Sequence, residues 1–173
     1  MKRIVTLTVL NQSGVLNRVT GVLSKRQFNI DSITVGHTEN EEISRMTIVV
    51  NVEDDRQAEQ LTKQLNKLID VLKVTDITDQ AIVARELALI KVYSNPQTRN
   101  EISGIVEPFR ASIIDVSKDS VTIQVTGDTN KIEALIDLLK PYGIKEMART
   151  GLTAFLRGAQ KPVAELASFS LLK

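Results

Sequence analysis

The chain runs twice through the same order of strand-like and helix-like patterns, and this repeat limits the folds it can adopt. In the first round, apolar residues at every second position predict strands at residues 5–9, 28–35, 43–52 and 71–77. Apolar residues at three- and four-residue spacing predict helices after residues 14 and 54. The order βαββαβ favours an antiparallel sheet with both helices on one face.

The second half repeats this order with little residue identity to the first. It predicts strands at residues 86–93, 111–116, 121–125 and 144–148, and helices after residues 98 and 128. Asp54 and Gln57 have the spacing of a capping box, as do Thr98 and Glu101. Asp128 is placed to cap the last helix. We therefore predict an α+β protein of two ferredoxin-like βαββαβ units.

The connection at residues 78–84 is short and polar, and it is the predicted boundary between two domains. We assign residues 1–78 to the first domain and residues 79–158 to the second. The tail at 159–173 departs from the repeat, and we expect it to be flexible. Each domain is close to the lower size limit for independent stability, and each sheet has one face without helices. Both points favour a homodimer.

Composition excludes several classes of function. The chain has 22 Lys and Arg against 21 Asp and Glu, so no excess of charge favours nucleic acid or a membrane surface. It has no cysteine, which excludes disulfides and thiolate chemistry, and His37 alone cannot form a metal site. No signal-peptide pattern or membrane-length apolar run occurs, so we expect a soluble cytoplasmic protein.

The loop between the first predicted strand and helix is the best candidate for a binding site. It consists of Asn11, Gln12, Ser13 and Gly14, followed by Val15 and Leu16 at the start of the helix. A helix N-terminus presents unpaired N–H groups and a partial positive charge, which suit a small carboxylate. We expect Asn29, which begins the second strand, to lie at the same end of the sheet as Asn11.

Each of these residues also has a structural interpretation. Asn11 suits a turn, Asn29 suits a helix C-terminus, and Gly14 can simply be the first helical residue. The acidic residues at 41–42 and 53–55 do not converge, and His37 is placed like a surface residue. Phosphate-loop and nucleophile-elbow motifs are absent, as are the strand aromatics of RNA-binding relatives of this topology. The residues favour a sensor or interaction protein over an enzyme.

Six segments together resemble the small, regulatory subunits of acetolactate synthase, also called acetohydroxyacid synthase. They are Asn11 to Val19, Phe28 to Gly36, Ser44 to Ile48, Leu65 to Val74, Glu107 to Val116 and Ala148 to Gly158. The first half is similar to an ACT domain, the amino-acid-sensing version of this fold. The tail after Gly158 does not contribute to the resemblance.

The resemblance implies that this chain carries no cofactor and is not itself an enzyme. In this family a separate, large catalytic subunit uses thiamine diphosphate, Mg²⁺ and FAD to join two pyruvates, or pyruvate with 2-oxobutyrate. The small subunit activates it and confers feedback inhibition, usually by valine, in branched-chain amino-acid biosynthesis. The sequence leaves open whether valine, leucine or isoleucine is the effector here.

The resemblance also implies an effector site at the seam of a dimer formed through ACT domains. Backbone N–H groups around Ser13, Gly14, Val15 and Leu16 would hold the effector carboxylate, with Gln12 beside them. Asn11 would bind the carboxylate or the amine. Asn29 and Ile30 of a second copy would close the site.

Two other functions stay open at this point. One is a stand-alone ACT-type sensor acting on another enzyme or on a transcription system, which co-purification of a thiamine-dependent partner would exclude. The other is a small enzyme of ferredoxin-like fold such as an acylphosphatase, although Asn11 and Arg18 do not have the arrangement that such an enzyme needs.

Overall fold

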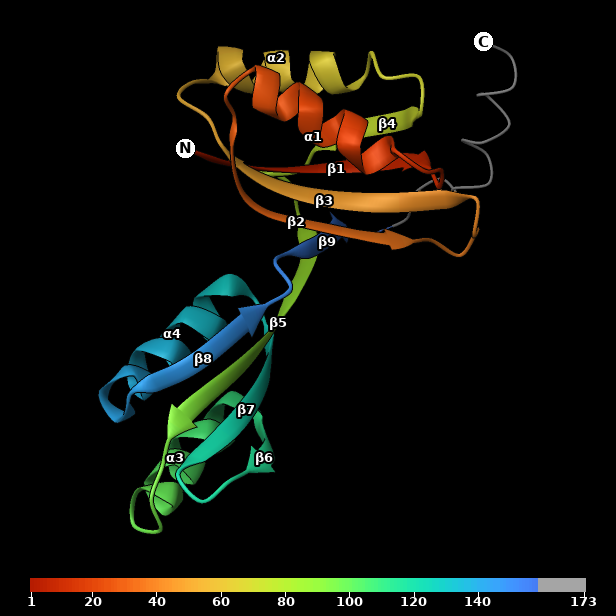
Figure 1. Ribbon diagram of the computed structural model, residues 1–173. Helices are drawn as coiled ribbons and strands as arrows, with labels where there is room; N and C mark the ends of the chain where they lie inside the picture. Colours follow the sequence, from red (N-terminus) through yellow and green to blue (C-terminus); the bar gives the residue numbers. More distant parts are fainter. Residues whose placement is uncertain (159–173) are drawn as a thin grey trace. The chain divides into compact units, whose positions relative to one another are not determined.

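The computed structural model describes residues 1–158 and divides the chain into two compact units (Figure 1). Among the described residues, the first unit contains 1–83 and 152–158, and the second contains 84–151. The sequence-based domains end instead at residues 78 and 158, and they remain a proposal. The flexible tail predicted for residues 159–173 lies outside the described residues.

The first unit contains the predicted βαββαβ order. Its elements are β1 (Lys2–Leu10), α1 (Val15–Lys25), β2 (Asn29–His37), β3 (Ile43–Asn51), α2 (Asp55–Leu65) and β4 (Val71–Asp76). The strands form an antiparallel sheet in the order β2-β3-β1-β4, so β2 is an edge strand. Both helices cover one face of this sheet (Figure 1). The α+β class and the ferredoxin-like topology predicted from the sequence are confirmed.

Alternation along the strands builds the core of this unit. Val5, Leu7 and Val9 of β1 point toward the helices and are almost fully buried. Val19 of α1 and Leu61 of α2 pack against them from the helix layer. Complete burial of a side chain of this kind stabilises the fold by about 1.5–3 kcal/mol.

Threonines cross the opposite face of the first sheet in one row. The register pairs Thr34 with Thr47, Thr47 with Thr6, and Thr6 with Thr75, so one threonine comes from each strand. A further strand, β9 (Thr153–Leu156), pairs with the start of β5 (Ile82–Tyr93) and lies over this row. Thr34 donates a hydrogen bond to the Leu152 carbonyl at 2.9 Å. Part of the uncovered face expected from the sequence is therefore covered by the chain's own β9.

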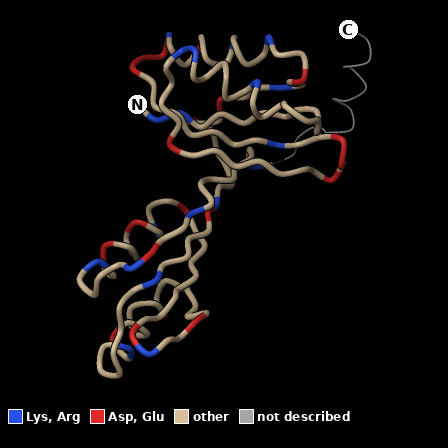
Figure 2. The backbone as a smooth tube through the Cα atoms, viewed as in Figure 1, with Lys and Arg blue, Asp and Glu red and all other residues tan. Residues whose placement is uncertain are grey.

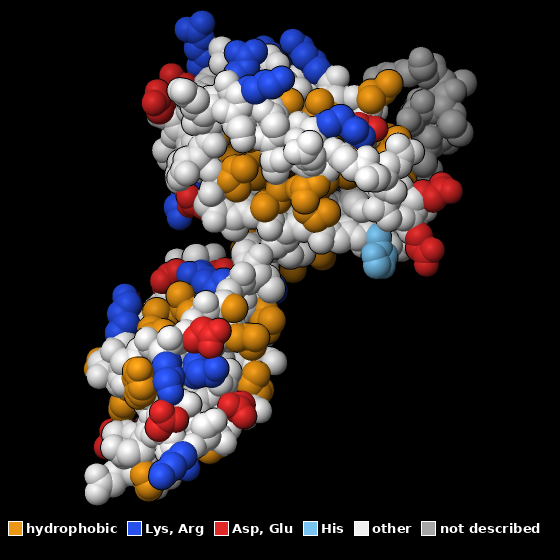
Figure 3. Space-filling view, viewed as in Figure 1, with side chains coloured by type: hydrophobic (Ala, Val, Ile, Leu, Met, Phe, Trp, Pro, Cys, Tyr) orange, Lys and Arg blue, Asp and Glu red, His pale blue; other side chains and the backbone are white. Residues whose placement is uncertain are grey.

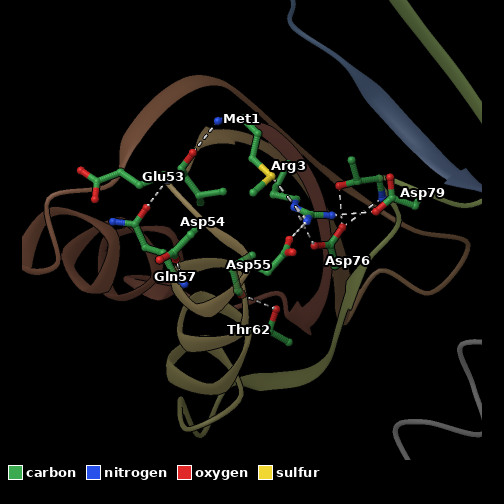
Figure 4. A network of polar contacts seen from close by, with 12 residues as sticks. Met1, Arg3, Glu53, Asp54, Asp55, Gln57, Thr62, Asp76 and Asp79 are labelled. Atoms are coloured by element: carbon green, nitrogen blue, oxygen red, sulfur yellow. Dashed lines mark hydrogen bonds and ion pairs between the residues drawn. The ribbon is translucent and has the colours of Figure 1, made fainter.

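Arg3 joins three parts of the first unit (Figure 4). Its guanidinium, on β1, contacts Asp55 at the start of α2 and lies 3.9 Å from Asp76 at the end of β4. It also donates to Asp79 at 2.7 Å, and this hydrogen bond is the main cause of its raised pKa. Because its side chain is only 13% exposed, Arg3 is a structural residue that ties strand ends to a helix start.

The second unit repeats the topology. It contains most of β5, then α3 (Thr98–Val106), β6 (Ser112–Val116), β7 (Ser120–Gly127), α4 (Thr129–Leu139) and β8 (Ile144–Arg149), with short 3₁₀ turns at Glu107–Phe109 and Lys140–Tyr142. The strand order is β6-β7-β5-β8, again antiparallel. Ile90 of β5, Ile123 of β7 and Leu135 of α4 lie in its buried core.

Two of the three predicted helix caps are confirmed. Asp54 accepts a hydrogen bond from the Gln57 N–H at 2.7 Å, and Asp128 accepts from the Lys131 N–H at 2.8 Å. The Gln57 Oε1 atom accepts in return from the Glu53 N–H at 2.7 Å, one residue before the N-cap, so the pair is a variant of the reciprocal capping box.

The predicted Thr98–Glu101 capping box is wrong. The Asn95 side chain accepts instead from the N–H groups of Gln97 and Thr98, each at 2.9 Å. Pro96 fixes its own φ near the value of a turn, so the chain begins to turn before Thr98, which is already helical.

Acidic and basic residues are interspersed over both units (Figure 2). No helix in residues 1–158 has the length and apolarity that a membrane crossing requires. Within the same residues, no three His, Cys, Asp or Glu side chains are grouped so that they could hold a metal ion.

Candidate functional site

The loop between β1 and α1 ends at a glycine with a left-handed backbone conformation. Gly14 has φ +83° and ends the loop immediately before α1. Any other residue there would be strained, because a Cβ atom disfavours this conformation by roughly 1–2 kcal/mol. Gly14 is therefore required by the backbone. The interpretation of it as an ordinary first helical residue is wrong.

Several backbone N–H groups of this loop are free to bind a ligand. Among the described residues, the N–H groups of Ser13, Gly14 and Leu16 have no protein partner. The N–H of Val15 already donates to the Gln12 carbonyl at 3.3 Å, and the Val15 side chain is buried in the core. The anion-binding capacity expected from the sequence is thus concentrated on three exposed N–H groups.

Asn11 is a turn residue that keeps one polar atom available. Its backbone N–H donates to the Glu42 carbonyl and its side-chain Nδ2 donates to the Glu41 carbonyl, both at 2.7 Å. These bonds tie the end of β1 to the β2–β3 hairpin, as the turn interpretation predicts. The Asn11 Oδ1 atom has no partner in the described part of the chain, so it can accept from an ammonium group.

Arg18 adds a guanidinium that sequence reasoning missed. Its Nη1 atom lies 3.1 Å from the position where a Cβ on Gly14 would stand, so the guanidinium lies against the loop. Its Nε donates to Asp70 at 2.6 Å, and the Asp70 side chain is only 9% exposed. The two Nη atoms remain free of protein partners in residues 1–158, and such a fork suits a carboxylate. The helical spacing of Arg18 from Gly14 was the signal that could have revealed it.

The Asn29 half of the predicted site lies at the other end of the sheet. Asn29 pairs with Asn51, which pairs with Lys2, whereas Leu10, next to Asn11, pairs with Ile43. Eight residues of strand separate the two ends, a distance of about 26 Å. The prediction that Asn11 and Asn29 share one end is wrong, because α1 returns the chain to the end where β1 began.

A β-bulge shapes the chain at Asn29 and Ile30. The register of β2 against β3 shifts between Ile30 and Ser32, which leaves Asp31 as the extra residue. The Asp31 carboxylate accepts from Lys2 of β1 at 2.8 Å and from Asn51 of β3 at 2.5 Å, so side chains of two other strands fix the bulge. Asn29 is exposed and takes no part in ending α1, where the N–H of Phe28 bonds to the Leu23 carbonyl. The helix C-terminus interpretation of Asn29 is therefore wrong.

Comparison with known proteins places the chain in a family. Residues 85–158 match the family described as the small subunit of acetolactate synthase, and residues 5–73 match the acetohydroxyacid synthase small-subunit-like ACT domain. The chain belongs to the acetolactate synthase small-subunit family. The resemblance predicted from the six sequence segments is thus confirmed.

Relatives match over nearly the whole chain. The acetolactate synthase small subunit of Bacillus subtilis is 67% identical over 172 residues, which cover 99% of this chain and 100% of that protein. The small subunit of Aquifex aeolicus is 52% identical over 157 residues, covering 90% of this chain and 81% of that protein. The crystal structure of the Thermotoga maritima small subunit is 41% identical, with a TM-score of 0.83 over 92% of this chain and 99% of that one.

Proposed function

We propose that this small subunit activates a separate catalytic chain in the cytoplasm and makes it sensitive to valine. The catalytic chain would carry thiamine diphosphate, Mg²⁺ and FAD, and would condense two pyruvates or pyruvate with 2-oxobutyrate. Membership of the small-subunit family supports a regulatory part in such an assembly. The exposed β1–α1 loop, with its free N–H groups and the adjacent Arg18, supports a binding site for an amino acid.

The register of the sheet supports an effector site shared by two copies. One chain holds Asn11 and Asn29 at opposite ends of its sheet, so it cannot bring both to one small ligand. The strand that begins with Asn29 is an edge strand. If two β2 strands pair antiparallel about a two-fold axis, the Asn29 end of one copy meets the Asn11 end of the other. The separation of Asn11 and Asn29 within one chain is the observation that supports the proposed homodimer site.

Each part of a bound valine has a proposed partner. The N–H groups of Ser13, Gly14 and Leu16 and the Arg18 guanidinium would hold the carboxylate, while Asn11 Oδ1 would accept from the ammonium group. The helix N-terminus alone contributes about 0.3–1 kcal/mol, so the guanidinium and the direct hydrogen bonds must supply most of the affinity. Asn29 and Ile30 of the second copy would close the pocket around the side chain. A pocket of this kind separates valine from leucine by only about 1–3 kcal/mol.

Inhibition then follows from linkage between two binding events. A valine held at the seam favours one geometry of the dimer, and activity falls if that geometry suits the inactive catalytic subunit. The coupling is reciprocal, so binding of the catalytic subunit must change valine affinity by the same factor.

Mixing two defective variants tests the shared site. Asn11→Ala and Asn29→Ala should each abolish valine binding by the purified chain, as measured by calorimetry. In a mixed dimer, one site combines the intact Asn11 of one chain with the intact Asn29 of the other. A one-to-one mixture with random exchange should therefore regain roughly one quarter of the wild-type sites.

The unmixed variants are the controls. Asn29→Ala should keep the wild-type unfolding midpoint, and Asn11→Ala should lower it slightly, because it loses the hydrogen bond to the Glu41 carbonyl. Failure to regain any site after confirmed subunit exchange would contradict the shared site. The regulatory role itself is tested separately, by asking whether wild-type chain raises the activity of the thiamine-dependent catalytic subunit and renders it valine-sensitive. A chain that neither binds nor activates that subunit would contradict the proposed function.

A further inference from the structure

A second hollow lies on the face of the first sheet that carries no helices. It has a volume of about 290 Å³ and lies between the end of β2, the start of β3 and β9. Three of the segments that carry the family resemblance meet there, through Gly36, Arg45 and Thr153. None of the residues proposed for the effector site lines it. The chain's one histidine, His37, lies exposed at its rim, and Figure 3 shows it open to solvent.

The hollow exists because a glycine faces an arginine. Gly36 pairs with Arg45 across the β2–β3 ladder, so both lie on the same face of the sheet. A Cβ on Gly36 would meet no heavy atom within 4 Å, which shows open space directly beside Arg45. Thr47, two residues along β3, points into the same space and receives a hydrogen bond from the Ala154 N–H at 3.3 Å.

Arg45 has no ion pair or hydrogen bond from its guanidinium in the described part of the chain. The residue is partly buried but its guanidinium nitrogens stay open to solvent, and a guanidinium without a carboxylate partner can bind one through two parallel hydrogen bonds. Its five donors are accompanied by the hydroxyl hydrogen of Thr47, since that oxygen already accepts from Ala154. The hollow therefore offers a fork of N–H donors with a hydroxyl donor close by.

The charge balance of the lining selects the ligand class. Glu39 also lines the hollow and is exposed, so its negative charge opposes a doubly charged anion such as phosphate. We propose that the hollow binds a small monocarboxylate, with its carboxylate on Arg45 and an adjacent hydroxyl or keto oxygen on Thr47. This site is independent of the proposed effector site.

His37 provides a direct measurement, because the chain contains no other histidine. We would record the imidazole proton signals of the full chain by NMR while adding sodium acetate, lactate or pyruvate at constant ionic strength. The His37 signals should shift and saturate. Lactate and pyruvate should bind more tightly than acetate.

Variants that should change the affinity in opposite directions make the test decisive. Arg45→Gln should weaken binding roughly 10- to 100-fold, as loss of a charge-assisted bond predicts. Arg45→Lys keeps the charge and loses the fork, so it should bind with intermediate affinity. Glu39→Gln, at an exposed position, should bind about threefold more tightly because a repulsive charge is removed. Arg56→Gln removes an exposed arginine of α2, on the helix-covered face of the same sheet, and as the matched control it should leave the titration unchanged.

Three results would overturn the proposal. The first is a His37 shift that stays linear to the highest concentration, as sodium chloride alone would give. The second is phosphate binding as tightly as lactate, which contradicts the assignment to a monocarboxylate. The third is a wild-type affinity in Glu39→Gln, combined with an Arg45→Gln variant that either keeps the wild-type affinity or fails to fold.

Discussion

Replacement of Gly14 by Asp or by Asn isolates the role of charge at the proposed effector carboxylate. The two side chains have the same shape, and both must adopt φ +83° at this position. Each variant should therefore lose about 1–2 kcal/mol of unfolding free energy from backbone strain. Only Asp adds a negative charge, and it adds it beside Arg18, whose Nη1 lies 3.1 Å from the new Cβ.

The charge effect can be sized from this geometry. Two carboxylates about 5 Å apart repel by roughly 3 kcal/mol at an effective dielectric constant of about 20. The Arg18 side chain is 45% exposed, so solvent reduces this repulsion, and we take about 1.5–2 kcal/mol as the net effect. Valine affinity should then fall roughly 10- to 30-fold in Gly14→Asp. Gly14→Asn should retain most of the affinity.

Thermal unfolding of the purified chain with valine measures both effects together. Valine at 100 times its dissociation constant stabilises the wild type by about 2.7 kcal/mol, which raises the midpoint by about 5–10 °C. At the same concentration, a 20-fold weaker Gly14→Asp gains only about 1 kcal/mol, or about 2–4 °C. If valine raised the unfolding midpoint of Gly14→Asp as much as that of the wild type, binding of the effector carboxylate at this helix N-terminus would be refuted. An equally small shift in Gly14→Asn would show that strain, and not charge, is responsible.

Two further predictions concern stability. Asp54→Ala removes the side-chain acceptor for the Gln57 N–H and should cost about 1 kcal/mol of unfolding free energy in urea; an unchanged midpoint would contradict the cap. The pKa of Asp119 is lowered chiefly by a hydrogen bond from Lys145, so this pair stabilises the fold above the ordinary Asp pKa of 3.8 and ceases to do so as pH falls through the folded pKa. Asp119→Asn should therefore lose stability at neutral pH and show a shallower acid decline, with Asp115→Asn, an exposed carboxylate without an ion pair in residues 1–158, as the comparison; parallel stability curves for Asp119→Asn and wild type would argue against the pair.

Local sequence was sufficient for the elements and the topology. One apolar face of β1 is specified by the alternation at Val5, Leu7 and Val9. One apolar face of each helix is specified by the periodic apolar residues of α1 and α2, and only a two-layer arrangement buries all of these faces. The same holds for caps that use a side chain and a neighbouring N–H, such as Asp54 and Asp128. The Thr98 prediction failed because Asn95 competes for the same N–H groups, and a spacing rule does not rank two competing acceptors.

The candidate site depended on contacts that no local pattern contains. Gly14 was visible in the sequence, but its left-handed φ was not, and Arg18 is held beside it by a hydrogen bond to the buried Asp70, 52 residues away along the chain. The placement of Asn29 opposite Asn11 depends on strand register, which is a property of the whole sheet. The Arg45 hollow requires β9 to return to the first sheet from beyond residue 151.

The family, the two βαββαβ units and the loop that offers free N–H groups could all be predicted from local sequence, because each depends on residues close together in the chain. Tertiary structure alone decided which charges flank that loop, which end of the sheet each asparagine occupies, and what covers the open face. The physical reason is that strand pairing and long-range ion pairs are selected by the burial energy of the whole unit, and period and spacing do not encode them.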